Sequence, residues 1–353
     1  MNAIWIALKD LKLLARDRVA LFWVLGFPLL FAGLFGEVIA SASAPADRKS
    51  QLVVVDEQRS AASAQLVTAL KAQTALEVSH ADLATARAHV RRGDRLAFLR
   101  LPDEGGKPQL GVDWTRASEA DALSRSVAAA VAPAAVAPSR DGMFDVERVG
   151  ASAGNLRVLA FPAALLWCLM ACAATFAVSL AAERSAGTEL RLRAAPVSRA
   201  TLLGGKALAC LLACLAGTGL LVFLGWVALD IGPQSLWGLA LALPSACVAF
   251  VGLVFLFGSV GGSEQAVAGA GWASLIVLAM LGGAMVPLSA LPQWLVPASH
   301  LSPVKWGIVA FEGVYFRGFA ISDLLLPCGV LVGMGAVAGL VGLSLMTRRH
   351  ARA

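Results

Sequence analysis

The chain has 353 residues, of which 58% are hydrophobic and 15% charged, and its mean hydropathy is +0.74. This composition is too apolar for a soluble globular protein, and it excludes collagen, coiled-coil, disordered and disulfide-stapled secreted proteins. The net charge of +6 does not indicate a nucleic-acid partner, because the excess Lys and Arg residues lie at the ends of apolar segments. We therefore expect an α-helical membrane protein that binds no nucleic acid.

Residues 1–18 predict an amphipathic helix at the cytoplasmic surface of the membrane. Apolar residues such as Ile4 and Leu8 recur at helical spacing on one face, and Lys9 and Lys12 lie largely on the other. Such a helix lies in the membrane interface and leads into the first span. A basic flank that only orients that span is the alternative.

Six segments are apolar enough to cross a bilayer, which takes about 20 residues because a helix rises about 1.5 Å per residue. The small-residue run at 41–44 resembles a signal-peptidase site, so cleavage there is the alternative to a first span. All six cysteines fall inside apolar runs, which predicts buried small side chains rather than disulfides. The predicted spans are 19–40, 158–182, 207–229, 236–260, 266–288 and 324–346.

The distribution of Lys and Arg predicts the orientation of these spans, because basic residues concentrate on the cytoplasmic side. Every basic cluster falls on one side if the six spans begin and end inside. The N-terminus, the loop 183–206 and the C-terminal tail then face the cytoplasm. The charge-balanced block 41–155 and the segment 289–322 face outside.

Residues 41–155 predict a small extracytoplasmic α/β domain, because short apolar strands alternate with helices. Asp82 is a candidate N-cap and Gly93 a candidate C-cap of the second helix. The Ala/Pro-rich stretch 128–142 predicts a tether back to the membrane. The predicted strands are 51–56, 76–79, 96–102 and 109–114, and the predicted helices are 60–72, 82–93 and 117–131.

The sequence contains no motif for ATP hydrolysis. Gly205-Lys206 is followed by Ala207, and Ala200 stands where a phosphate-binding loop needs its leading glycine. The cysteine pairs at i, i+4 spacing have no histidine within the spans to complete a zinc site. We therefore expect a transport subunit that is not an enzyme, with no catalytic residue, metal or cofactor in this chain.

The segment 181–209, between the second and third predicted spans, carries a resemblance to a known family. It resembles the cytoplasmic loop of the permease subunits of type-2 ABC exporters, which reads E-R-x-x-G-T, then a Pro followed by Ser or Thr, then G-K. The matching residues are Glu183, Arg184, Gly187, Thr188, Pro196, Ser198, Gly205 and Lys206.

Two other segments are similar to parts of the same family. Residues 282–318 resemble its outer pair of re-entrant half-helices, with Pro287, Pro292 and Trp294 at matching places. The block 41–155 resembles the domain inserted after the first span in the subgroup with a large extracytoplasmic domain. The resemblance thus covers residues 19–40 as the first span and 156–353 as spans two to six.

The resemblance implies a permease of the bacterial inner membrane, with both termini cytoplasmic, that exports a hydrophobic or amphipathic substrate such as a drug-like molecule or lipid. It implies a dimer with a second copy or a paralogue, contact with membrane lipids, and two partner ABC ATPases that bind ATP and Mg. The residues that it assigns to ATPase coupling are Glu183, Arg184, Gly187, Thr188, Arg191, Pro196 and Lys206. Ordinary interfacial charge is the alternative for Glu183, Arg184 and Arg191.

Three residues are candidates for the translocation pathway or its gate. Glu312 lies in the outer segment 289–322, where a carboxylate is costly unless it faces water or pairs. Pairing with Lys305 or Arg317 is its alternative role. Glu37 near the outer end of the first span and Pro287 are the other two candidates.

Two different functions remain open on the residues alone. A membrane-anchored sensor or binding protein would use the block 41–155 as its ligand domain, although the cytoplasmic segments are short for an effector. An ion-coupled secondary transporter would place ionisable residues in the middle of its spans, and the predicted spans contain almost none.

Overall fold

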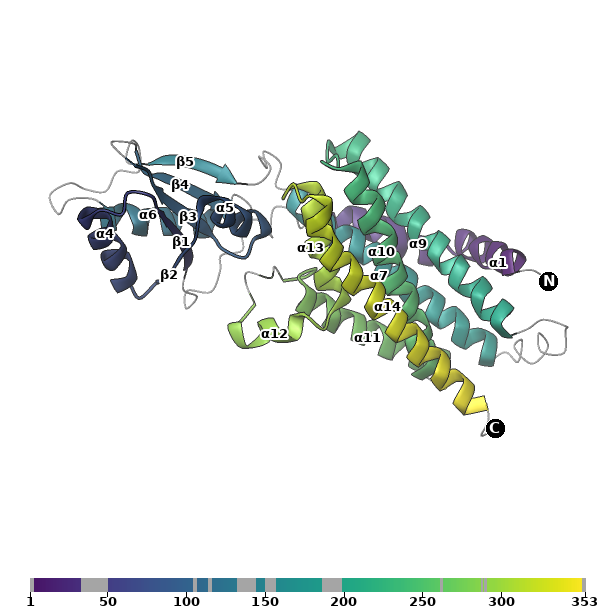
Figure 1. Cartoon of the computed structure of the whole chain (residues 1–353). Helices are drawn as coiled ribbons and strands as arrows, with labels where there is room; N and C mark the ends of the chain where they lie inside the picture. Colours follow the sequence, from purple (N-terminus) through teal and green to yellow (C-terminus); the bar gives the residue numbers. More distant parts are fainter. Residues whose placement is uncertain are drawn as a thin grey trace. The chain divides into compact units, whose positions relative to one another are not determined.

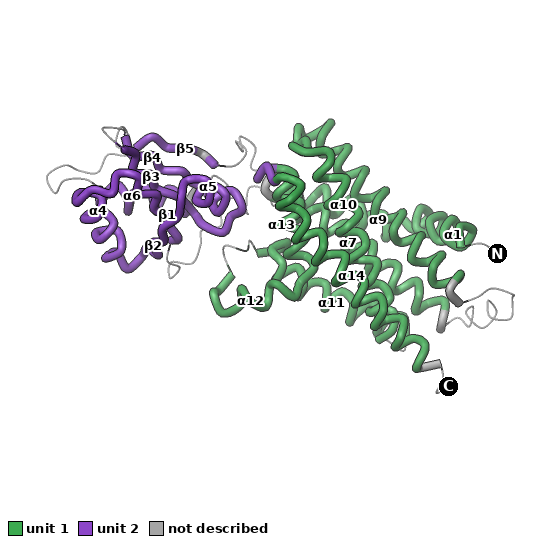
Figure 2. Tube along the Cα trace, in the orientation of Figure 1, with its two compact units in different colours: residues 1–36, 160–315, 320–353 green, residues 37–159, 316–319 purple. Residues whose placement is uncertain are grey.

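The computed structural model shows two compact units, a helical unit and a sheet unit (Figures 1 and 2). The helical unit comprises residues 1–36, 160–315 and 320–353, and the sheet unit comprises residues 37–159 and 316–319. The structure describes residues 3–32, 50–103, 107–113, 116–131, 144–149, 157–185, 199–260, 263–286, 288 and 291–350.

The sheet unit is built on five strands in the order β2-β1-β3-β4-β5. Strand β1 pairs in parallel with β2 and β3, β3 pairs antiparallel with β4, and β4 pairs in parallel with β5. The strands are β1 (Ser50–Asp56), β2 (Leu76–His80), β3 (Ala97–Leu101), β4 (Gln109–Asp113) and β5 (Asp145–Val149), and the helices are α4 (Ala61–Ala72), α5 (Leu83–Arg92) and α6 (Ala117–Val131).

Helices cover both faces of this sheet (Figure 1). Alternate residues of β1 point to opposite faces, so Leu52 packs with α4 and α6 while Val53 packs with α5. The helices that follow β1 and β2 therefore lie on opposite faces. This arrangement opens a crevice at the carboxyl ends of the two strands.

Local capping signals in the sheet unit are confirmed. Asp82 accepts a hydrogen bond from the backbone N–H of Thr85, and hydrogen bonding with the side chain and then the backbone of Thr85 holds the pKa of the Asp82 carboxyl below its usual value. Gly93 ends α5 at φ 78°, a left-handed conformation that glycine adopts without strain. Each predicted strand and helix of the block is present in the described residues, and β5 is a strand that we did not predict.

The helical unit contains five helices that are long and apolar enough to cross a membrane, among the residues described. Shorter helices precede and follow them, including one apolar helical stretch from Arg18 to Ala32. The long helices are α7 (Arg157–Ser185), α9 (Arg199–Leu229), α10 (Leu236–Val260), α11 (Glu264–Gly282) and α14 (Ile321–His350), and the shorter ones are α1 (Ala3–Arg16), α2 (Arg18–Leu21), η1 (Phe22–Gly26), η4 (Gln293–Leu295), α12 (Val296–Ser299) and α13 (Pro303–Tyr315).

These helices account for five of the six predicted spans. The predicted first span, 19–40, is described only as far as Ala32, and its remainder lies outside the described residues. The predicted span 266–288 is too long, because α11 ends at Gly282 and Gly283 adopts a left-handed φ of 95° that stops the helix.

Glycines bring α10 and α14 into close contact. A Cβ at Gly252 would collide with the carbonyl oxygen of Gly335, and one at Gly335 would lie 2.5 Å from the oxygen of Val248. Small residues allow membrane helices to approach in this way. The ring centroid of Phe27 lies 5.3 Å from that of Trp167, so the first apolar stretch contacts α7.

Candidate functional site

Four charged side chains from three helices form a closed ring in the helical unit. Lys9 Nζ lies 3.0 Å from Asp10 Oδ1 and 2.8 Å from Glu183 Oε1. Lys206 Nζ lies 3.3 Å from Asp10 Oδ2 and 2.7 Å from Glu183 Oε2. Each carboxylate thus contacts both lysines through its two oxygens, and positive and negative groups alternate around the ring. We call these four residues the charge ring.

Part of the charge ring is buried. The side chains of Asp10 and Lys206 are 3% and 6% exposed, whereas that of Lys9 is 47% exposed. A buried ion costs several kcal/mol unless it is paired, so removal of one partner leaves the others in an unfavourable state. Burial lowers the pKa of Lys9, but its pairing with Glu183 and Asp10 outweighs that effect and raises the pKa above the ordinary value.

A steric contact lies beside the charge ring. A Cβ at Gly205 would lie 2.8 Å from Ile6 Cβ and 2.9 Å from the carbonyl oxygen of Ala3, so only glycine permits α1 to pack this closely on α9. Ile6 and Ala7 are buried in that contact, whereas Ile4 and Leu8 on the adjoining face of α1 are exposed. The predicted apolar face of this helix is therefore divided between α9 and an exposed surface.

The charge ring fixes the two ends of the predicted coupling loop. Glu183 lies in the last turns of α7, and Lys206 lies near the start of α9. Both belong to the residues that the sequence predicts for ATPase coupling, and the structure brings them together on α1. Arg184 lies within α7, and its side chain is outside the described residues, as are Gly187, Thr188, Arg191 and Pro196.

Lys9 and Asp10 are the site residues that sequence reasoning missed. They lie 174 and 196 positions before their partners Glu183 and Lys206, and helical periodicity does not report such contacts. One signal was available: Asp10 interrupts the apolar buried face of α1, between Ile6 and Leu14 at i, i+4 spacing. An acidic residue at that place indicates a buried partner of opposite charge.

The predicted pathway residues are only partly described. Glu312 lies in α13, and Glu37 and Pro287 lie outside the described residues. Of the predicted partners of Glu312, Lys305 lies with its Nζ 2.7 Å from His300 Nε2. Arg317 belongs to the sheet unit, where its Nη1 lies 3.3 Å from Asp113 Oδ2.

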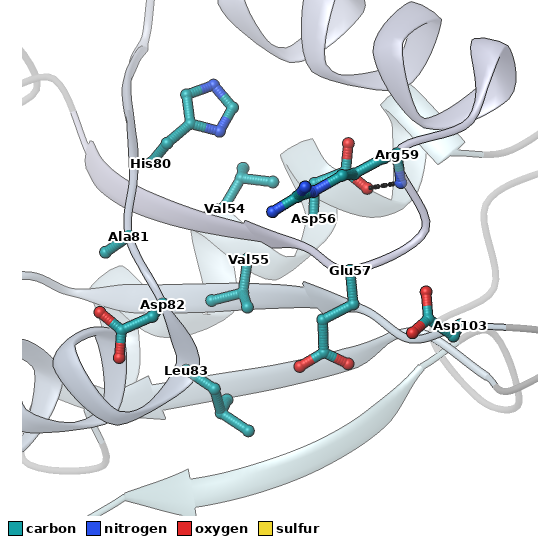
Figure 3. Close-up of a pocket in the computed structure, with 10 residues that line it drawn as sticks. All are labelled: Val54, Val55, Asp56, Glu57, Arg59, His80, Ala81, Asp82, Leu83 and Asp103. Carbon is teal, nitrogen blue, oxygen red and sulfur yellow. Dashed lines mark hydrogen bonds between the residues drawn. The ribbon is translucent and has the colours of Figure 1, made fainter.

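The sheet unit has a pocket at the carboxyl ends of its parallel strands (Figure 3). Its cavity of about 650 Å³ is of the size that holds small organic ligands in proteins. It lies where the connections after β1 and β2 diverge to opposite faces, which is the usual position of ligand sites in open α/β sheets. The lining residues are Val54, Val55, Asp56, Glu57, Arg59, His80, Ala81, Asp82, Leu83 and Asp103.

Several of the pocket's carboxylates already have partners within the protein. Asp56 accepts from Ser63 Oγ and from the backbone N–H of Arg59, Glu57 pairs with Arg100 at 3.0 Å, and Asp82 caps α5. No group of His, Cys, Asp or Glu among the described residues is arranged to hold a metal ion. Much of the negative charge that lines the pocket is therefore already paired or hydrogen-bonded within the chain.

Together, these features define a multi-pass membrane protein that contains a helical unit, a separate sheet unit, and a charge ring at the ends of the segment between α7 and α9. A model of the family described as ABC-2 family transporter protein matches residues 18–344, so the chain belongs to this family. Permeases of this family are transport subunits that generally work with ATPase partners. No curated protein matches the chain.

Proposed function

We propose that the chain is the permease subunit of an exporter that removes a hydrophobic or amphipathic substrate from the bacterial inner membrane. The observation that carries this proposal is the family match over residues 18–344, which covers the whole of α7, α9, α10 and α11 and follows α14 as far as residue 344. The outward direction of transport and the hydrophobic or amphipathic class of substrate are the parts of the proposal that go beyond the family assignment. An apolar set of spans suits a lipid or drug-like molecule.

ATP and Mg are bound by two partner ATPases in this proposal, because the chain's own sequence has no phosphate-binding loop. The loop 183–206 docks on the partner, and this loop and both termini face the cytoplasm. The charge ring supports that role, because it gives both ends of the segment 186–198 a fixed base on α1. A second copy of the chain or a paralogue completes the translocation pathway.

The predicted site residues divide into two roles. Glu183 and Lys206 hold the loop through the charge ring, since their charged groups contact partners within the chain. Arg184, Gly187, Thr188, Arg191 and Pro196 are the proposed docking residues of the loop. Glu312, Glu37 and Pro287 remain proposed for the pathway at the outer side.

Purification of the tagged full chain from its native membrane tests the partnership. We expect a phosphate-binding-loop ATPase to co-purify in equal amount, as identified by mass spectrometry, and to hydrolyse ATP. Arg184→Glu reverses charge at the start of the loop and should reduce ATPase retention at least several-fold. Lys12→Glu, an exposed lysine of α1 outside the charge ring, is the matched control and should retain the ATPase.

A second function, ligand binding by the sheet unit, is favoured by the pocket at the ends of β1 and β2. This function is compatible with transport, because a permease can carry its own binding domain. Native mass spectrometry of the full chain tests it. A co-purifying small molecule should be lost in Leu83→Trp, which fills the pocket, and kept in Gln65→Trp on the exposed side of α4.

Equal ligand occupancy in these two variants would place any bound molecule elsewhere and remove the support for this second function.

A further inference from the structure

The charge ring differs from a set of independent surface ion pairs. Its four contacts close on themselves, so each charge shares two partners, and two of the four side chains are nearly inaccessible to water. Opening any one contact leaves a buried charge without half of its compensation. Small relative movements of α1, α7 and α9 at this point are therefore resisted together, and the three helix segments behave as one joint.

The steric contact at Gly205 reinforces the same joint. Gly205 is adjacent to Lys206 on α9, and it meets Ile6 and Ala3, which lie one and two turns before Asp10 on α1. Charge pairing and close packing thus act within neighbouring turns of the same two helices. A displacement of the start of α9 cannot leave α1 in place without both opening the ring and separating a tight van der Waals contact.

Two further contacts link α1 to the helices that follow it. The carboxylate of Asp17 accepts from the backbone N–H groups of Val19 and Ala20, and it caps the bend from α1 into α2. The stretch that follows reaches α7 through the ring contact of Phe27 with Trp167. A movement of α1 is therefore delivered to the first apolar stretch and to the helix that lies most deeply in the bundle.

We propose that the charge ring is the joint that makes α1 move with both ends of the α7–α9 loop. Force applied to this loop reaches the first apolar stretch through α1, and it does not pass only through α7 and α9. The inference rests on the proposed function for the source of the force. The attachment of α1 to the loop ends is a property of this chain alone.

Hydrogen exchange of the full chain in lipid nanodiscs tests the attachment. Lys206→Met removes one ring charge at similar volume, and we expect the amides of residues 3–16 to exchange on the order of 100-fold faster, because a buried ion pair has lost one partner. Lys12→Met on the exposed side of α1 is the control and should leave this exchange unchanged. Unchanged exchange in Lys206→Met would overturn the proposal.

A double-mutant cycle tests whether Asp10 and Lys206, which pair directly between α1 and α9, are energetically coupled. If Asp10 and Lys206 act as one unit, the variant with both Asp10→Asn and Lys206→Met should exchange no faster in α1 than the worse single variant. Additive effects would overturn the ring. Hydrogen exchange of the amides in α10 and α14 reports whether each variant remains folded. If this exchange is faster in Lys206→Met than in the unmodified chain, Lys9→Met, at the exposed position of the ring, takes its place.

The transmission is tested in the complex with the co-purified ATPase. Addition of ATP and Mg should change exchange at the ends of α7 and α9 and in α1 of the unmodified chain. In Lys206→Met, only the ends of α7 and α9 should respond. An equal response of α1 in both would overturn the transmission, whereas failure of any ATPase to co-purify would contradict the proposed function and leave the attachment result standing.

Discussion

Gly205 and Lys206 are neighbours on α9 that serve the same contact in different ways. Lys206 places its ammonium between two carboxylates, and Gly205 leaves room for the backbone of α1. The resemblance marked this pair from the sequence, but its physical role depends on α1, nearly 200 residues earlier. The resemblance assigned Glu183 and Lys206 to ATPase coupling, and only the fold shows that their charged groups lie 2.7 Å apart.

Gly205→Ala tests the close packing of α1 on α9. The added methyl group would overlap Ile6, so we expect the free energy of unfolding to fall by about 1–3 kcal/mol and exchange in α1 to rise. Gly204→Ala is the matched control, because its Cβ would meet no atom within 4 Å. Thermal unfolding of the two variants in the same detergent, together with hydrogen exchange, measures the difference. Equal behaviour of both variants would show that α1 does not pack closely at Gly205.

At the scale of elements, long apolar runs and local caps were predictable, and contacts between distant segments were not. The segment 236–260 coincides with α10, because length and hydropathy alone identify a span. α11 ends early because Gly283 takes a left-handed conformation, which an apolar count does not register. β5 was missed because Asp145–Val149 is short and carries three charges, as edge strands often do.

Gly252→Ala tests whether glycine is needed for the close contact of α10 with α14. Gly252→Ala would force its methyl group against the backbone of Gly335, and we expect a loss of about 1–3 kcal/mol in stability. Gly333→Ala on α14 meets no atom within 4 Å and should be neutral. Thermal unfolding in detergent compares them, and a loss of stability in Gly333→Ala as large as in Gly252→Ala would refute close glycine packing as the cause.

At the scale of the whole molecule, the excess of Lys and Arg behind the net charge of +6 predicts the orientation of the spans. The balanced charges of the block 41–155 suit a soluble unit, and the structure gives that block its own sheet and core. Membership in the ABC-2 family makes the helical unit a permease. Substrate identity is not encoded in any short motif, because spans rich in Ala, Leu, Val and Gly select mainly for apolar character.

The proposed division of labour between this chain and a partner ATPase is tested most directly by ATP hydrolysis in nanodiscs. The complex purified through the tagged chain should hydrolyse ATP. A variant with residues 186–198 replaced by Gly and Ser residues of equal number should lose the ATPase and at least 90% of the activity, roughly the effect of losing a docking contact of 1.4 kcal/mol or more. Full ATPase activity in that variant, or a complex that contains no ATPase, would contradict this division of labour.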